Sequence, residues 1–114
     1  MKKYDCQGDF FNGLALVELN GKKGFIDIEG KEVIPLIYDD CWSFFYKGLT
    51  IATLNEKCGF IDEKGNEIVP LIYDDCRSFD GNMAHVRLNG KYLYIDKNNR
   101  RFTDIKEFMG LFYK

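Results

Sequence analysis

A repeat of 35 residues constrains this sequence more than any other feature. The segment from Gly24 to Phe44 returns as Gly59 to Phe79, and 15 of the 21 positions are identical. An internal period of this length is typical of proteins built from tandem structural units, because each unit buries its apolar face against the next. Most residues then belong to the scaffold, so functional residues are expected where one unit departs from the others.

The repeat predicts how the chain is organised. Its 114 residues suffice for one domain and are too few for two. We expect a single domain over 1–114, with a partial unit at 1–9, three units at about 10–44, 45–79 and 80–103, and a cap at 104–114. In the cap, Asp104 and Glu107 fit a helix capping box. Apolar residues follow with helical spacing, at Ile105, Phe108, Met109 and Phe112, so the C-terminal cap is predicted to be a short helix or turn.

Within each unit, alternating apolar residues predict three strands that form a β-meander. The first strands are residues 14–19, 49–54 and 83–88. The small residues of these strands are expected to face inward, namely Ala15, Val17, Leu19, Thr50, Ala52, Leu54, Ala84, Val86 and Leu88. The residues between them are expected to face solvent, namely Leu16, Glu18, Ile51, Thr53, His85 and Arg87.

Turns and later strands complete each meander. Asn20-Gly21 and Asn89-Gly90 are strong hairpin signals, with Asn55-Glu56 as an altered turn between them. Second strands are expected at 23–27, 58–62 and 92–96, and third strands at 32–38 and 67–73. Pro35 and Pro70 put the third strands at a sheet edge or bend them.

No segment has room for a crossover helix, so the fold class is all-β. The three tandem repeats of about 35 residues either stack openly or close into a pseudo-threefold barrel. The unit that is split between the two termini favours the closed form, in which the termini meet.

Composition argues against several classes of protein. The formal net charge of −2 gives no reason to expect nucleic-acid binding. No apolar run approaches the ~20 residues that cross a bilayer, and no signal peptide opens the chain. We therefore predict a soluble, cytoplasmic protein with four reduced cysteines and no membrane association. The sequence leaves the oligomeric state open.

The repeat motif resembles a known family. Its elements are Gly-Leu-Ala-x-Val, Asn-Gly-Lys-x-Gly-Phe-Ile-Asp, Gly-Lys-Glu-Val-Ile-Pro and Tyr-Asp, which extend over about residues 10–100. This pattern is similar to the WG (or KWG) repeat of bacterial proteins. The Trp of the Trp-Gly pair is replaced by Lys23, Cys58 and Tyr92, and the Gly of the third unit by Leu93. The resemblance implies an all-β binding module and brings no catalytic residues.

Repeated carboxylates are one candidate for chemistry. The pairs Asp39-Asp40 and Asp74-Asp75 either bind a divalent cation or accept backbone hydrogen bonds at strand ends, and the sequence favours the second role. A structural role is also expected for the aspartates before the second turn, which are Asp27, Asp62 and Asp96.

The cysteines are the other candidate. Cys6, Cys41 and Cys76 fall at one position in successive units, so they could hold zinc in a closed array or serve as small buried residues. Cys58 has no visible partner except His85, the single histidine, with which it could form a nucleophile and base. The sequence favours packing for Cys6, Cys41 and Cys76 and leaves Cys58 as a departure from the repeat. No catalytic residue, metal or cofactor is predicted.

Departures from the repeat predict residues that bind a partner. Trp42, Phe45 and Tyr46 stand where the next unit has Arg77, Asp80 and either a gap or Gly81, and aromatic residues are enriched at protein interfaces. A basic, aromatic C-terminal segment is a second candidate surface, with Lys97, Arg100, Arg101, Lys106, Phe108 and Phe112. The predicted partner-binding residues are Trp42, Phe45, Tyr46, Arg77, His85, Arg100 and Arg101. The alternative role of the three aromatic residues is to fill the space between two units. The alternative role of the C-terminal segment is to pack as a helix with solvated charges.

The sequence therefore predicts a non-enzymatic module that binds another protein. A small acidic chain without a catalytic set could be an inhibitor or immunity factor that blocks a larger enzyme, such as a nuclease or defence effector, with acidic rows covering a basic groove. One alternative is recognition of glycans or cell wall by stacking of Tyr and Trp on sugars. Another is a metal-dependent enzyme that uses the Asp pairs.

Overall fold

The repeat folds into three antiparallel sheets of four strands each. A computed structural model describes residues 4–42, 45–77, 79 and 81–102, and the described residues contain no helix. The first sheet contains β1 (Cys6–Phe11), β2 (Leu14–Leu19), β3 (Lys22–Asp27) and β4 (Glu32–Tyr38); the middle sheet β5 (Asp40–Cys41), β6 (Leu49–Leu54), β7 (Lys57–Asp62) and β8 (Glu67–Tyr73); the third sheet β9 (Asp75–Cys76), β10 (Ala84–Leu88), β11 (Lys91–Ile95) and β12 (Arg101–Phe102). The predicted all-β class is confirmed. The predicted C-terminal helix lies outside the described residues.

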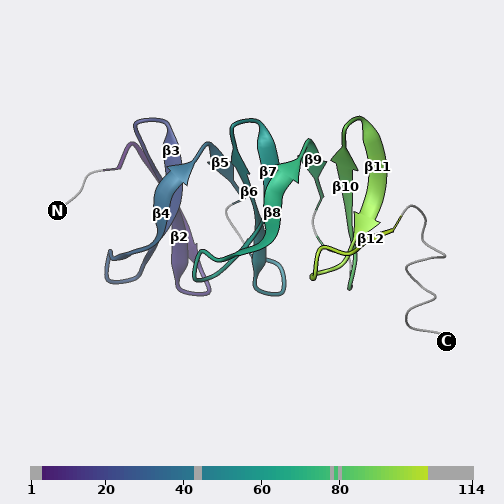
Figure 1. The fold of residues 1–114 in the computed structure, drawn as a ribbon. Coiled ribbons are helices and arrows are strands. Elements are labelled where there is room, and N and C mark those ends of the chain that lie inside the picture. The colour runs from purple at the N-terminus through teal and green to yellow at the C-terminus, as the bar shows by residue number, and fades with distance from the viewer. Residues whose placement is uncertain (1–3, 43–44, 78, 80, 103–114) are drawn as a thin grey trace.

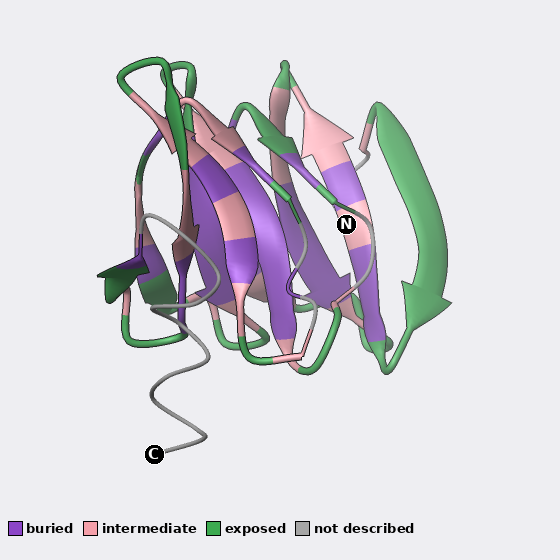
Figure 2. Cartoon of the chain, turned by 90° about the vertical axis from the view of Figure 1, so that its right-hand side faces the viewer, coloured by how far each residue is buried: buried purple, intermediate pink, exposed green. Residues whose placement is uncertain are grey.

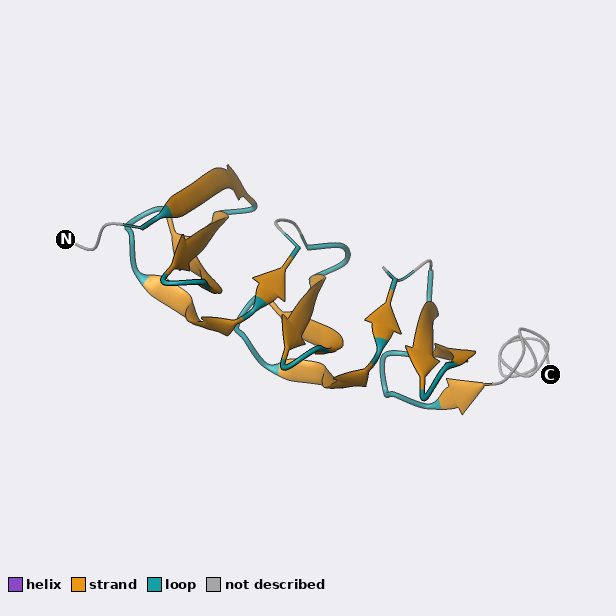
Figure 3. Ribbon diagram, turned by 90° about the horizontal axis from the view of Figure 1, so that it is seen from above, coloured by secondary structure: helices purple, strands orange, loops and turns teal. Residues whose placement is uncertain are grey.

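The three sheets stand side by side in an open row (Figure 1). The row measures 54 × 27 × 18 Å, and β1 and β12 lie at its opposite ends (Figure 3). A closed barrel needs hydrogen bonds from the edge of one unit to the edge of the next. Here each sheet pairs its strands only with one another and packs its face against the next sheet. The expectation that the termini meet in a barrel is therefore wrong.

The tight turns follow the sequence. Backbone φ is positive at both central residues of each predicted hairpin turn, with values of 53° and 81° at Asn20 and Gly21, 53° and 68° at Asn55 and Glu56, and 53° and 82° at Asn89 and Gly90. Such turns match the right-handed twist of the flanking strands. The middle turn thus keeps the hairpin geometry with a glutamate where glycine fits at lower cost.

Each sheet also has a fourth strand that the three-stranded meander did not include. Asp40 and Cys41 pair with β6, and Asp75 and Cys76 pair with β10. The chain therefore leaves one sheet at the end of β4 or β8 and begins the next sheet after a single connecting residue. β4 and β8, which carry Pro35 and Pro70, lie at sheet edges as predicted.

Most of the core is divided between two joints, where neighbouring sheets meet. The first joint packs the first sheet against the middle sheet, with Leu14, Phe25, Ile34, Tyr38, Cys41, Ala52 and Ile61 buried in it. The second joint packs the middle sheet against the third, with Leu49, Ile51, Cys58, Phe60, Val69, Tyr73, Cys76, Phe79, Ala84, Val86 and Ile95 buried in it.

The middle sheet is therefore buried on both faces (Figure 2). Its small residues face the first joint, as predicted, and Ala52 is fully buried. Ile51 is only 5% exposed, so the prediction that its face meets solvent is wrong. The reason is that the third sheet covers this face, whereas a period of two in the sequence records only that the two faces of a strand differ.

Strand β1 departs from the register of its counterparts. Cys41 pairs with Ala52 and Cys76 pairs with Val86, but Cys6 pairs with Glu18 and leaves Gln7 opposite Val17. A slip of one residue turns a side chain to the other face of the strand. Cys6 is therefore exposed, as is all of β1 (Figure 2), while Cys41 and Cys76 are buried. The prediction that the three cysteines share one position is wrong for Cys6.

Candidate functional site

The aspartates that precede the second turn of each unit are structural. Asp27 accepts backbone N–H bonds from Glu29 and Lys31, both at 2.9 Å. The corresponding bonds of Asp62 come from residues 64 and 66, and those of Asp96 from residues 98 and 100, at 2.8–2.9 Å. Each carboxylate thus closes its own turn, as an aspartate commonly does.

The first member of each Asp pair connects two neighbouring sheets. Asp39 accepts the Asn55 N–H at 2.8 Å and pairs with Lys22 of the preceding sheet. Asp74 pairs in the same way with Lys57. The lysine that donates a hydrogen bond to each carboxyl lowers the pKa of that carboxyl. These contacts support the structural role, and no group of three potential metal ligands occurs within the described residues.

Trp42 and Tyr46 lie on the linker between β5 and β6. Each is 38% exposed. The backbone holds both residues, because the Trp42 N–H donates to Ile51 O at 3.1 Å and Tyr46 exchanges two backbone bonds with Leu49. Their side chains border one crevice, and the Lys47 ammonium lies 5.7 Å from the centre of the Tyr46 ring. These two predicted residues are thus at the surface and close together.

Phe45, by contrast, belongs to the first joint. Its ring lies 5.1 Å from the ring of Phe25, and the ring of Phe79 lies 4.7 Å from that of Phe60, which is the counterpart of Phe25. Phe45 therefore corresponds to Phe79, and its alignment with Asp80 is wrong. The repeat loses its one residue before Phe79, and packing of the joint accounts for Phe45.

The basic candidates lie elsewhere. Arg77 is exposed at the position that follows β9, as Trp42 follows β5. On the far side of the third sheet, Arg100 pairs with Asp96 at 2.6 Å, and the Arg101 guanidinium lies 5.8 Å from the centre of the Tyr73 ring. The two arginines are held by these contacts. The predicted residues thus fall at opposite edges of the third sheet and do not form one site.

The outward face of the third sheet is polar and aromatic. His85 stacks on Tyr94, with ring centres 4.8 Å apart and an interplanar angle of 17°. The ring centre of Tyr92, which is on the same strand as Tyr94, lies 5.0 Å from that of His85. His85, Tyr92 and Tyr94 take the positions of Ile51, Cys58 and Phe60. On this face the third sheet therefore carries polar rings, where the middle sheet carries residues that are buried in the second joint.

The outward face of the first sheet keeps its apolar residues. Ala15, Val17 and Ile26 form a small cluster there with Tyr4 and Leu36. In the later sheets the positions of these residues form the joints, where Ala52, Ile61 and Leu71 meet the preceding sheet. The two ends of the row thus present different surfaces.

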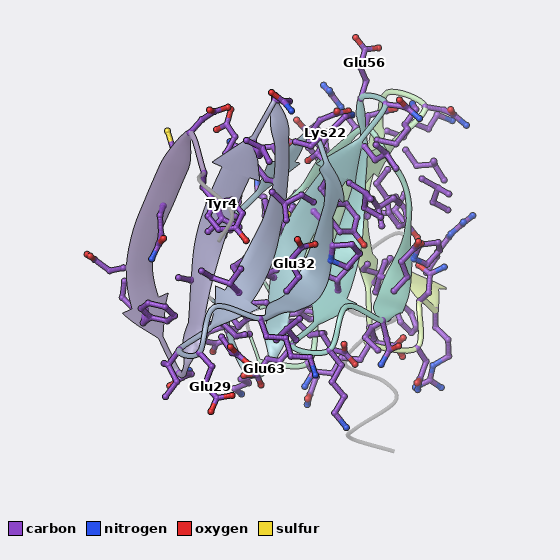
Figure 4. The ribbon with its side chains drawn as sticks, turned by 90° about the vertical axis from the view of Figure 1, so that its left-hand side faces the viewer. Tyr4, Lys22, Glu29, Glu32, Glu56 and Glu63 are labelled. Carbon is purple, nitrogen blue, oxygen red and sulfur yellow. The ribbon has the colours of Figure 1, made fainter. Side chains whose placement is uncertain are left out.

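A wide hollow of about 860 Å³ opens on this outward face. Figure 4 shows Tyr4, Glu29 and Glu32 of its lining on this side of the molecule. We call it the N-terminal hollow. It is lined by Tyr4, Phe10, Ile26 and Ile28 together with the carboxylates of Asp27, Glu29 and Glu32. Phe10 is 42% exposed and Ile28 is 76% exposed. An adjoining hollow of about 450 Å³ shares Tyr4 and Glu32.

No pattern in the sequence predicts the N-terminal hollow, but one signal for it is present. Ile28 is apolar where the other units carry Glu63 and Lys97. It is a departure from the repeat of the same kind as Trp42. An isolated exposed isoleucine needs no explanation, and only the fold places Ile28 beside Tyr4 and Phe10.

The comparison with known families agrees with this architecture. The family model of the WG-containing repeat matches residues 3–22, 24–58 and 59–92, which together make up most of the chain. No curated protein and no solved structure matches the chain. In the part of the chain that the structure describes, no helix is long and apolar enough to cross a membrane. The resemblance is thus confirmed even without the signature Trp, and family membership points to a repeat-based module for protein interaction. The chain belongs to the WG-containing repeat family.

Proposed function

We propose that this chain is a protein-interaction module that binds its partner at the N-terminal hollow and acts as an inhibitor. The observation that carries the proposal is the contrast between the two ends of the row. His85, Tyr92 and Tyr94 make one end polar, as the terminal unit of a repeat array requires. The other end keeps an apolar surface, and exposed apolar patches with a polar rim mark sites of interaction.

Charge indicates the chemistry of the partner. Three carboxylates line the N-terminal hollow, from Asp27, Glu29 and Glu32, and no lysine or arginine lines it among residues 4–42, 45–77, 79 and 81–102. Complementary charge speeds association and excludes wrong partners. The surface therefore suits a protein that presents lysine or arginine beside an apolar residue. A basic groove of a nuclease or defence effector has this character, and the bound module would block it.

A photo-crosslinking experiment tests both the class of function and the surface. A benzophenone amino acid is placed at position 28, inside the N-terminal hollow, and in a matched variant at Glu63, the exposed counterpart in the middle sheet. Irradiation of host cells is expected to give one stoichiometric protein adduct from position 28 and none from position 63. If neither position gives an adduct, the chain is not a protein-interaction module of this kind.

Charge reversal sharpens the test. Glu29→Lys is expected to weaken binding of the captured protein by roughly 10-fold or more, mainly by slowing association. Glu56→Lys, on the β6–β7 turn, is the control for total charge and should leave binding unchanged. Equal losses in the two variants would contradict a specific acidic surface. Addition of the wild-type chain to the captured protein should then reduce the activity of that protein.

Recognition of glycans is the second candidate, because Trp42 and Tyr46 present exposed rings near each other. Retention on a peptidoglycan column that Trp42→Ala abolishes, without any protein adduct from position 28, would support this candidate and overturn the first. Loss of partner binding in Trp42→Ala with unchanged melting temperature would move the protein-binding surface to this linker.

A further inference from the structure

Cys58 and Cys76 face each other across the second joint. Cys58 lies in β7 of the middle sheet and Cys76 in β9 of the third, and their Sγ atoms are 2.7 Å apart. Two carbon atoms make their best non-bonded contact at ~3.5–4.0 Å. Sulfur is larger than carbon, so the two Sγ atoms are closer than an ordinary non-bonded contact. A disulfide needs ~2.05 Å. Less than one ångström of movement would therefore join the two sheets covalently.

The pair is specific to the second joint. At the first joint the position of Cys58 is occupied by Lys23, which forms an ion pair with Asp40 at 2.8 Å. Cys41, the counterpart of Cys76, thus faces an ion pair where Cys76 faces a thiol. Cys6 is exposed because of the register slip in β1. Of the four cysteines, only Cys58 and Cys76 are placed to react with each other.

We propose that Cys58 and Cys76 form a reversible disulfide that staples the middle sheet to the third sheet. The oxidant is a small-molecule disulfide such as oxidised glutathione. The Cys58 thiolate attacks one of its sulfur atoms, forms a mixed disulfide and releases one small thiol. Cys76 then loses its proton and attacks the Cys58 sulfur, which releases the second small thiol. The two cysteines lose two electrons, and the two protons end on the two released thiols.

The surroundings of the pair support this order of attack. The hydrogen bond between the two thiols lowers the pKa of Cys58, and the same bond together with burial raises the pKa of Cys76. The two side chains are only 6% and 7% exposed, so the oxidant reaches them when the joint opens locally. β9 has two residues and lies at the edge of its sheet, and short edge elements open most readily.

Peptide mapping tests the link. The folded protein is incubated with oxidised glutathione, alkylated with iodoacetamide in guanidinium chloride and digested with trypsin without reductant. Cleavage after Lys57, Lys64 and Arg77 puts Cys58 in the peptide 58–64 and Cys76 in the peptide 65–77. We expect these two peptides to be joined, with Cys41 alkylated and the exposed Cys6 either alkylated or linked to glutathione. Alkylation of all four cysteines, or a link between Cys6 and another cysteine of the chain, would overturn the proposal.

Matched variants separate the staple from unspecific oxidation. Cys41→Ser should leave the link intact, whereas Cys76→Ala should abolish it; Cys58→Ser serves as a second test if Cys76→Ala does not fold. Oxidation should raise the melting temperature of the wild type by roughly 10 °C and leave that of Cys76→Ala unchanged. A link that forms in guanidinium but not in the folded protein would show that the fold does not bring the thiols together.

Discussion

The middle and third sheets share one pattern but meet different surroundings. The positions that hold Ile51, Cys58 and Phe60 in the middle sheet hold His85, Tyr92 and Tyr94 in the third. The first set is buried in the second joint, and the second set stacks on the outward face. The position of a sheet in the row, and not the position of a residue in the repeat, therefore decides which side chain is required there. An apolar residue is needed only where a following sheet covers the face.

The first sheet sharpens this lesson from the other end. Its outward face carries Ala15, Val17 and Ile26, the residues that later sheets use for stacking. Tyr4 and Leu36 pack over them, and Phe10 and Ile28 remain exposed nearby. One end of the row thus has polar substitutions that end the stack. The other end retains an apolar, acid-lined surface, which is why we assign partner binding to it.

The largest expected effect comes from removing the ring that fills the second joint. Phe60→Ala should lower the free energy of unfolding by about 3–5 kcal/mol, because the ring of Phe60 is buried against Phe79 and its loss leaves a cavity. Tyr94→Ala, at the same position of the third sheet, should cost about 1 kcal/mol, since it removes stacking on His85 at a half-buried site. Urea titration of both variants measures the difference. Equal losses would mean that the outward face of the third sheet is as well covered as the joint.

A smaller effect is expected where strands β7 and β8 approach each other. A Cβ added to Gly59 would lie 2.4 Å from the carbonyl oxygen of Val69 and 2.5 Å from that of Pro70. Gly59→Ala should therefore cost about 1–3 kcal/mol through overpacking. The third sheet carries Leu93 at this position, and the described residues of β12 pair with Tyr94 and Ile95 of β11.

The control for this prediction is Gly8→Ala in β1. A Cβ there would meet its nearest neighbour at 3.8 Å, an ordinary contact. The variant should unfold at nearly the urea concentration of the wild type. If Gly59→Ala were equally mild, β8 would not be fixed against β7 as closely as the structure indicates.

The smallest expected effect concerns pH and the link between the middle and third sheets. The hydrogen bond from Lys57 lowers the pKa of Asp74 below its ordinary value of 3.8. The stabilising contribution of this carboxylate is therefore complete above that value and is lost as the pH falls through about 4 and below. Asp74→Asn should narrow the difference in melting temperature between pH 6 and pH 3. Asp9→Asn, in exposed β1, should leave that difference as in the wild type; a change of the same size there would point to net charge alone.

Much of the fold could be predicted from local patterns. Alternation in 14–19 and 49–54 identified strands, Asn20-Gly21 and Asn89-Gly90 identified turns, and the prolines identified edge strands, because each of these signals acts through a few neighbouring residues. The two-residue strands β5 and β9 are too short to show a period. The one-residue shift in register that exposes Cys6 also cannot be read from the sequence, because pairing register depends on the partner strand.

The candidate site was less accessible to prediction. Trp42 and Tyr46 could be identified as departures from the repeat, and both are exposed. Phe45 departs from the repeat only if the gap of one residue in the third unit is placed after Phe79. The contact of Phe45 with Phe25 shows instead that Phe45 is the counterpart of Phe79. The N-terminal hollow joins residues that are up to 28 positions apart in sequence, from Tyr4 to Glu32, so no local pattern shows it.

The family, the all-β class, the repeat and the turns follow from the amino-acid sequence alone, because backbone preference and the alternation of side chains are set within a few residues. The tertiary structure decided that the row is open, that both faces of the middle sheet are buried, that Cys58 meets Cys76, and that the first and third sheets present different ends. These outcomes depend on which face of one sheet meets another. Identical repeats carry the same local pattern whether or not a neighbour covers them, so only packing distinguishes a joint from an end.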